Sequence, residues 1–246
     1  MSRLEQGSQL RLNQAIAKTG LCSRRKADEL IAAGRVLVNA EVCKDFSRLV
    51  DPEHDELTVD GKSLSVRSFT YVLLNKPPGV VTTTSDEQGR ETVMDLLPPK
   101  LRHLKPVGRL DMYSEGLLVL TNDGDLAFKL THPRQHIPKL YEVRLRGFIS
   151  DKELQMLADG IPLEEATTLP AEVEIIGRNK THTDLQITII EGKNRQIRRM
   201  FAYLGYPVVR LVRLAVGGLQ LGHIAPGTWR YLTGQELSEL LSQSTE

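Results

Sequence analysis

The chain of 246 residues is poor in cross-linking residues and has no long apolar run. Its two cysteines, Cys22 and Cys43, have no histidine beside them at ligand spacing, so we expect neither a disulfide framework nor a zinc or other metal site. No stretch approaches the roughly 18 consecutive apolar residues of a membrane span, and the opening MSRLEQGSQLRL lacks the apolar core of a signal peptide. We therefore expect a soluble cytoplasmic protein that makes no membrane contact.

Several common catalytic motifs are also missing. The sequence has no glycine-rich Walker loop, no Gly-x-Gly-x-x-Gly after a predicted strand and no His-Glu-x-x-His. Its six histidines are scattered through polar segments, where an isolated histidine is usually a solvated side chain. Nucleotide-hydrolysing, dinucleotide-binding and zinc-protease activities are therefore not indicated.

The formal net charge is only +1, but the basic residues are clustered. Residues 8–44 contain seven basic and three acidic residues, a balance of +4, and residues 187–213 contain six and one, a balance of +5. Phosphate affinity depends on local charge, so two basic segments favour a polyanion that is contacted at two places. Two solvated helix faces are the alternative explanation of the charge pattern.

The first part of the chain predicts a small independent domain. Apolar spacing indicates helices within residues 10–20 and 23–34, the second beginning after Ser23 as N-cap. Short alternating segments follow within residues 35–42 and around the hairpin dipeptide Asp60-Gly61. Two helices followed by short strands predict a compact unit of residues 8–67, large enough to fold alone.

The rest of the chain, residues 69–240, predicts a second domain. Its strands outnumber its helices and follow no regular alternation with them. This pattern favours an α+β fold with a mixed, largely antiparallel sheet over a doubly wound fold. The predicted strands lie within 69–79, 79–84, 116–124, 139–147, 171–177, 183–192 and 206–218, and the predicted helices within 92–98, 125–133, 150–160 and 194–205.

An Arg-Leu-Asp triplet stands just before the aliphatic run Leu-Leu-Val-Leu. An arginine and a carboxylate have no packing reason to be there unless they are paired or used. On an extended segment Arg109 and Asp111 point to one side and Leu110 to the other. A partly desolvated carboxylate needs a nearby cation, for which Arg198 and Arg199 are candidates. These residues alone are compatible with a structural ion pair or with a catalytic carboxylate.

Four segments carry a resemblance to a known family. LNKPPGVVTT, VGRLDMYSEGLLVLTNDGDLAFKLTHP, KLYEVRLRG and EGKNRQIRRMFAYLGYPVVRLVR resemble, in order and spacing, the four signatures of the RsuA-type pseudouridine synthases of bacterial ribosomal RNA. The resemblance extends over residues 71–232. The first sixty residues resemble the small S4-like RNA-binding domain that this family often carries at its N-terminus.

The resemblance implies roles for individual residues. Asp111 would be the nucleophile, Tyr141 would pack on the target base and act as general base, and Arg198 would pair with the catalytic carboxylate. Arg109 would position the extruded nucleotide or its phosphate. The isomerisation involves no redox change and no loss of atoms, so no cofactor is expected.

The resemblance also gives the basic segments a role, because phosphate contacts dock a protein on folded RNA without reading its bases. The predicted RNA contacts are Arg11, Arg24, Arg25, Lys26, Arg35, Lys76, Arg109, Lys193, Arg195 and Arg199.

The predicted function is that of a monomeric enzyme that isomerises one uridine of ribosomal RNA, free or in an assembling subunit, after flipping it out of its stack. The catalytic segments favour 23S RNA of the large subunit. One alternative is a non-catalytic RNA-binding ribosome-assembly factor, which would have lost the aspartate or the tyrosine; both are present. Another is a synthase that acts on 16S ribosomal RNA or on transfer RNA.

Overall fold

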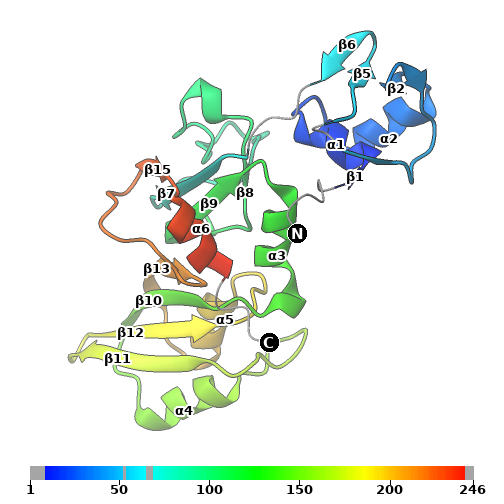
Figure 1. Cartoon of the computed structure of the whole chain (residues 1–246). Helices are drawn as coiled ribbons and strands as arrows, with labels where there is room; N and C mark the ends of the chain where they lie inside the picture. The colour runs from blue at the N-terminus through cyan, green and yellow to red at the C-terminus, as the bar shows by residue number, and fades with distance from the viewer. Residues whose placement is uncertain (1–8, 52–53, 65–68, 242–246) are drawn as a thin grey trace, which may run out of the picture. The chain divides into compact units, whose positions relative to one another are not determined.

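The computed structural model describes residues 9–51, 54–64 and 69–241. The chain folds as two compact units, residues 1–69 and 70–246 (Figure 1). No helix in the described part of the chain is both long enough and apolar enough to cross a membrane.

The N-terminal unit packs two helices against short strands. Leu12 and Ile16 from the first helix and Ala27 and Ile31 from the second are fully buried in its core. Its described elements are α1 (Leu12–Lys18), α2 (Arg24–Ala32), the four-stranded sheet β3 (Glu41–Val42), β2 (Val36–Val38), β5 (Leu57–Val59) and β6 (Lys62–Leu64), and the antiparallel pair β1 (Leu10–Arg11) and β4 (Leu49–Val50).

The local signals predicted for this unit are confirmed. The Ser23 hydroxyl accepts a hydrogen bond from the Lys26 amide at 3.3 Å, as an N-cap does. Asp60 and Gly61 both have positive φ, 51° and 75°, between β5 and β6. This backbone is the one that a two-residue hairpin of the predicted kind requires.

The second unit is built on a nine-stranded mixed sheet in which most strand pairs are antiparallel, as predicted. In the described residues β9 and β13 form a parallel pair in its centre. The strand order is β11 (Glu172–Arg178), β12 (His182–Ile189), β10 (Lys139–Arg146), β13 (Val208–Val216), β9 (Glu115–Thr121), β7 (Tyr71–Lys76) and β15 (Trp229–Tyr231); β14 (Leu219–Gln220) pairs with β13, and β8 (Lys105–Pro106) pairs with β9.

Glycine is required at the parallel pair. Gly116 lies opposite Arg213 with φ 102°. A Cβ at this position would lie 2.3 Å from the Arg213 carbonyl oxygen, far inside van der Waals contact. Only glycine therefore allows β9 and β13 to approach this closely.

Both faces of the sheet are covered, so the central strand β9 is buried and apolar from Gly116 to Leu120. On β9, Leu118 and Leu120 belong to one core cluster, whereas Leu117 and Val119 belong to the other. The first cluster includes side chains of α4 (Asp151–Asp159), α5 (Gln196–Tyr203) and residues 80–104; the second includes those of α3 (Gly124–Thr131) and α6 (Gly234–Leu241) (Figure 1). Strands buried on both faces lose the alternation that a half-exposed strand shows.

Two predictions in residues 79–98 are wrong. The expected strand at 79–84 is reduced to one isolated bridge between Val81 and Thr92. The expected helix at 92–98 is a turn, in which the Asp95 carboxylate accepts hydrogen bonds from the Thr92 amide at 2.8 Å and from its hydroxyl at 2.7 Å. Such a side chain competes with the helical pattern, and the following Pro98 and Pro99 lack the amide hydrogens that helix propagation needs. The described helix here is the 3₁₀ turn η1 (Pro99–Leu101).

Candidate active site

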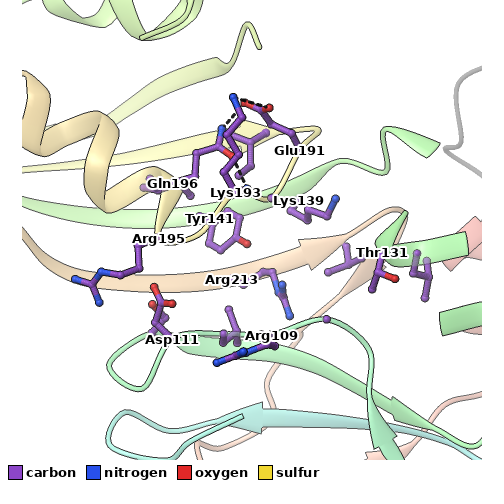
Figure 2. Close-up of a pocket in the computed structure, with 18 of the residues that line it drawn as sticks. Arg109, Asp111, Thr131, Lys139, Tyr141, Glu191, Lys193, Arg195, Gln196 and Arg213 are labelled. Atoms are coloured by element: carbon purple, nitrogen blue, oxygen red, sulfur yellow. Dashed lines mark hydrogen bonds and ion pairs between the residues drawn. The ribbon is translucent and has the colours of Figure 1, made fainter. Parts of the chain in front are cut away.

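A pocket of about 390 Å³ opens beside the parallel pair of the sheet (Figure 2). Its walls are the loop 107–111 that leads toward β9, parts of β10 and β13, and the segment 189–197 that ends β12 and begins α5. This volume is in the usual range for a small-molecule site. The segments are far apart in sequence, and the sheet brings them together.

Asp111 occupies the loop wall of this pocket. The Ser114 amide donates to the Asp111 carbonyl at 2.9 Å, which closes a tight turn. Leu110 is buried behind the loop, and the Thr82 hydroxyl donates to its carbonyl at 2.8 Å. Figure 2 shows the Asp111 carboxylate pointing from the loop toward the wall that holds Tyr141 and Arg195. The loop therefore presents a half-buried carboxylate to the pocket.

Lys76, at the end of β7, holds the same turn from inside the protein. Its side chain is 0% exposed, and its ammonium donates to the carbonyls of Pro77 at 2.9 Å, Met112 at 3.0 Å and Ser114 at 2.8 Å. Burial lowers the Lys76 pKa to about 8, against the opposing effect of Asp111. Lys76 is one of the predicted RNA contacts, and in this structure all three of its ammonium hydrogens are used inside the fold.

Arg198, on α5, reaches this turn from the other side. Its guanidinium donates to the Tyr113 carbonyl at 3.0 Å and to the Val208 carbonyl at 3.2 Å. Burial lowers the Arg198 pKa, and nearby Asp111 acts in the opposite direction. Within the described residues, Arg198 has no ion pair with a carboxylate within 4.0 Å. Its interaction with Asp111 is thus electrostatic and longer than a direct ion pair.

Tyr141 lies on β10, across the pocket from the Asp111 loop (Figure 2). It is 8% exposed and belongs to the core cluster. It pairs with Ile187 of β12 and with Arg213 of β13, next to a register shift between Leu140 and Tyr141. The strand pairs on both sides therefore fix the position of the residue, and Figure 2 shows its hydroxyl in the pocket.

The predicted basic residues of this unit fall into two groups. Arg109, Lys193 and Arg195 line the pocket. Lys193 is paired with Glu191 at 3.4 Å. Arg199 is absent from the residues that line it and forms a bidentate ion pair with Glu165.

The basic residues predicted in the N-terminal unit are on its surface. Arg11, Arg24 and Arg25 are exposed. Lys26 pairs with Glu29 at 2.6 Å, and Arg35 pairs with Asp60. Both pairs are solvent-exposed, so they cost little to open when a phosphate competes for the cation.

Two basic residues of the pocket were missed in the sequence. Lys139 and Arg213 both line the cavity. Lys139 stands two residues before Tyr141, so the period of a strand places both on one face. Arg213 stands in the mainly apolar segment LVRLAV. The strand period at Lys139 and the arginine within an apolar segment are both visible in the sequence. The pocket that the two side chains line is not.

The comparisons with known proteins agree with this architecture. A family model described as RNA pseudouridylate synthase matches residues 70–203, and a model of the S4 domain matches residues 10–57. A solved crystal structure of a pseudouridylate synthase superimposes with a TM-score of 0.68 at 33% identity, covering 94% of this chain and 99% of that one. The chain therefore belongs to the RNA pseudouridylate synthase family, whose members are isomerases that act on RNA, and it carries an S4 domain.

Three curated relatives are similar to this chain over 70% or more of its length. The chain is 39% identical to an RNA pseudouridine synthase of Aquifex aeolicus (strain VF5), with 94% of each chain covered. It is also 39% identical to the ribosomal large subunit pseudouridine synthase B of Bacillus subtilis (strain 168), over 94% of this chain and 95% of that one. To the ribosomal large subunit pseudouridine synthase E of Vibrio vulnificus (strain CMCP6) it is 42% identical, over 70% and 79%.

Proposed function

We propose that this protein converts one specific uridine of 23S ribosomal RNA to pseudouridine. Two relatives named as ribosomal large subunit synthases support the choice of RNA. The observation that carries the chemistry is the position of Asp111 on the wall of a nucleoside-sized pocket, with Tyr141 on the opposite wall. A ribosomal RNA substrate also implies a cytoplasmic protein, which we propose acts as a monomer.

The reaction defines what the pocket must do. The bond between N1 of uracil and C1′ of ribose breaks, the uracil turns, and a bond forms between C5 and C1′. N1 gains a proton and C5 loses one, so atoms and electrons balance without a redox partner. The enzyme has to extrude the nucleotide at a cost of a few kcal/mol, and then hold the detached base until it rejoins the ribose.

The residues around the pocket suit these steps. Asp111 is the proposed nucleophile, and a carboxylate must be ionised to attack carbon. Lys76 and Arg198 are both bonded to the turn after Asp111, and so hold in place the loop that carries it. Tyr141 is proposed to stack on the base, an interaction worth about 1–3 kcal/mol, and to accept the C5 proton. Arg109 is proposed to position the extruded nucleotide.

The S4 domain is proposed to dock the enzyme on the RNA. Its exposed cations would contact phosphates without reading sequence. They would hold the ribosomal RNA, free or in an assembling subunit, while the catalytic unit selects the uridine. The residues proposed for docking are Arg11, Arg24, Arg25, Lys26 and Arg35.

The test is the Asp111→Asn variant, which keeps the shape of the side chain but removes its charge. We expect wild-type folding and RNA affinity but no pseudouridine. The assay uses ribosomal RNA with tritium at C5 of uridine, made in a strain that lacks this protein, because C5 loses its hydrogen in the reaction. Asp159→Asn, at an exposed position of α4, is the matched control. Appreciable tritium release by Asp111→Asn would refute the nucleophile assignment.

The choice of RNA is tested separately. Pseudouridines are mapped in 16S, 23S and transfer RNA of that strain and of the parent. One pseudouridine missing from 23S RNA supports the proposal, and one missing from 16S or transfer RNA instead overturns its substrate.

A further inference from the structure

Two cations lie together in the part of the pocket between Tyr141 and Thr131 (Figure 2). Lys139 comes from β10 and Arg213 from the neighbouring β13. Neither has a role in the chemistry proposed above. Both line the same cavity as Asp111, so a ligand that reaches the carboxylate is also within the range of these two charges.

Arg213 is fixed in place and only partly used. The residue is 5% exposed, and its Nε donates to the Leu117 carbonyl at 2.8 Å. This bond sets the plane of the guanidinium beside the parallel strands. Its two terminal amino groups have no hydrogen-bond partner among the described residues, so they are available to a ligand in the cavity.

Lys139 is also without a partner. Its half-buried ammonium forms no hydrogen bond or ion pair with the part of the chain that the structure describes. Burial lowers the Lys139 pKa to about 8, and the positive charge of Arg213 acts in the same direction. The protein therefore holds two like charges near each other at a cost in folding free energy.

The acidic residues of the pocket do not neutralise these cations. Of the two that line it, Glu191 is bound by Lys193 at 3.4 Å and by the Gln196 amide at 2.6 Å, and Asp111 lies on the other wall. An unpaired buried charge is expensive. A ligand that brings a negative charge would remove this cost when it binds.

We propose that Lys139 and Arg213 form a subsite for a backbone phosphodiester of the RNA, next to the target uridine. The paired amino groups of an arginine fit two phosphate oxygens, and lysine adds a point charge. The subsite rests on the proposed function for its ligand. It gives the ribose half of the broken nucleotide an anchor, so that only the detached uracil turns within the pocket.

The sharpest probe is Lys139→Met, which keeps the side-chain length and removes the charge. Arg213 is less suitable, because its loss would leave the Leu117 carbonyl unpaired and disturb folding. Lys139→Arg tests rescue by another cation. Lys152→Met, at an exposed position of α4, is the matched control for loss of one lysine.

The first measurement is tritium release from ribosomal RNA at several salt concentrations. For Lys139→Met we expect KM to rise about tenfold, as for the loss of one charge-assisted hydrogen bond, with kcat within about twofold of wild type. The slope of log affinity against log salt should shrink by roughly 0.7 to 1, the value for one phosphate contact. Lys139→Arg should recover most of the KM.

A second measurement needs no turnover. Uridine monophosphates, with the phosphate at 5′ or 3′, should raise the melting temperature of wild type more than uridine does, and Lys139→Met should lose that difference. If RNA is modified and Lys139→Met equals Lys152→Met in KM and salt slope, the subsite is refuted. A fall in kcat at unchanged KM also refutes it, by placing Lys139 in the chemistry.

The two proposals can fail separately. If wild type releases no tritium, the proposed function fails, and the nucleotide measurement still decides the subsite. A phosphate-dependent stabilisation that requires Lys139 would then support an anion site, and its absence would overturn one.

Discussion

The S4 domain and the catalytic pocket both present basic residues, but they hold them in opposite ways. On α2, Arg25 and Lys26 are exposed, and Lys26 pairs with a solvent-exposed glutamate. In the catalytic unit, Lys76 and Arg213 are almost fully buried and bonded to backbone carbonyls. Exposed cations contribute together to the positive potential of the surface, so the loss of one is partly compensated by the others. Each buried cation instead makes its own fixed contacts, which no neighbour replaces.

The largest loss of stability and activity is expected for the buried cation Lys76. Lys76→Met would remove the ammonium donor from the carbonyls of Pro77, Met112 and Ser114, of which Met112 keeps the Gly79 amide. We expect a loss of about 3 kcal/mol in the free energy of unfolding, and a fall in kcat of about 100-fold or more as the turn after Asp111 loosens. Urea unfolding and tritium release measure the two.

Lys100→Met, at an exposed position of η1, is the control for Lys76→Met and should change neither quantity. A Lys76→Met variant with wild-type stability and turnover would show that a buried ammonium is not needed to hold the turn.

For the exposed cations of α2 we expect a smaller effect, which falls on RNA affinity and is shared among them. Replacing Arg24, Arg25 and Lys26 together by glutamine should raise the Kd for ribosomal RNA by roughly 30-fold at 0.15 M salt and flatten its salt dependence. Each single replacement should cost about threefold or less, and kcat at saturating RNA should stay at the wild-type value. Binding titrations measure the Kd, and single-turnover rates measure the activity at saturating RNA. A large loss in the saturated rate would show that these residues act in the active site and not in docking.

The smallest effect is a pH dependence of stability. The Lys139 pKa is lowered from 10.5 to about 8 in the folded protein, so the folded state resists charging this lysine. The resulting cost is complete below pH 8 and disappears as pH rises from 8 to 10.5. Arg213, on the adjacent strand, is the charged neighbour that adds to it.

Lys139→Met should therefore be more stable than wild type at pH 7. We expect a difference of only about 1 kcal/mol, since solvent screens a half-buried charge. The advantage should vanish near pH 10.5. Urea unfolding of both proteins across this range provides the measurement. A constant difference, or a more stable wild type at pH 7, would mean that the ammonium has a partner in solution.

Local elements could be predicted from the sequence where local physics decides them. Ser23 caps α2 as expected from its position before helical spacing, and Ser150 caps α4 at the start of the predicted helix 150–160. The alternation of Tyr141, Val143 and Leu145 marks β10, whose other face is more exposed. The mixed, largely antiparallel sheet could be predicted because the strands outnumber the helices and do not alternate regularly with them.

The features that were missed depend on distant partners. α6 and β15 lie beyond the last predicted strand, and α6 packs its apolar side chains into the core of the second sheet face. The environment of Lys76 was missed because its three acceptors come partly from residues more than thirty positions away. The proposed roles of Asp111 and Tyr141 came from the family resemblance, since no periodicity reveals that two segments share a pocket.

Gly116 has a consequence for how the enzyme could be damaged. In the described residues β9 and β13 are paired at two positions, and one of these pairs is Gly116 with Arg213. This short seam connects the half of the sheet that follows the Asp111 loop to the half that carries Tyr141. A methyl group at position 116 would meet the Arg213 backbone and force the seam apart. It would thereby change the spacing between the Asp111 carboxylate and the Tyr141 phenol and shift Arg213, although residue 116 itself has no side chain in the pocket.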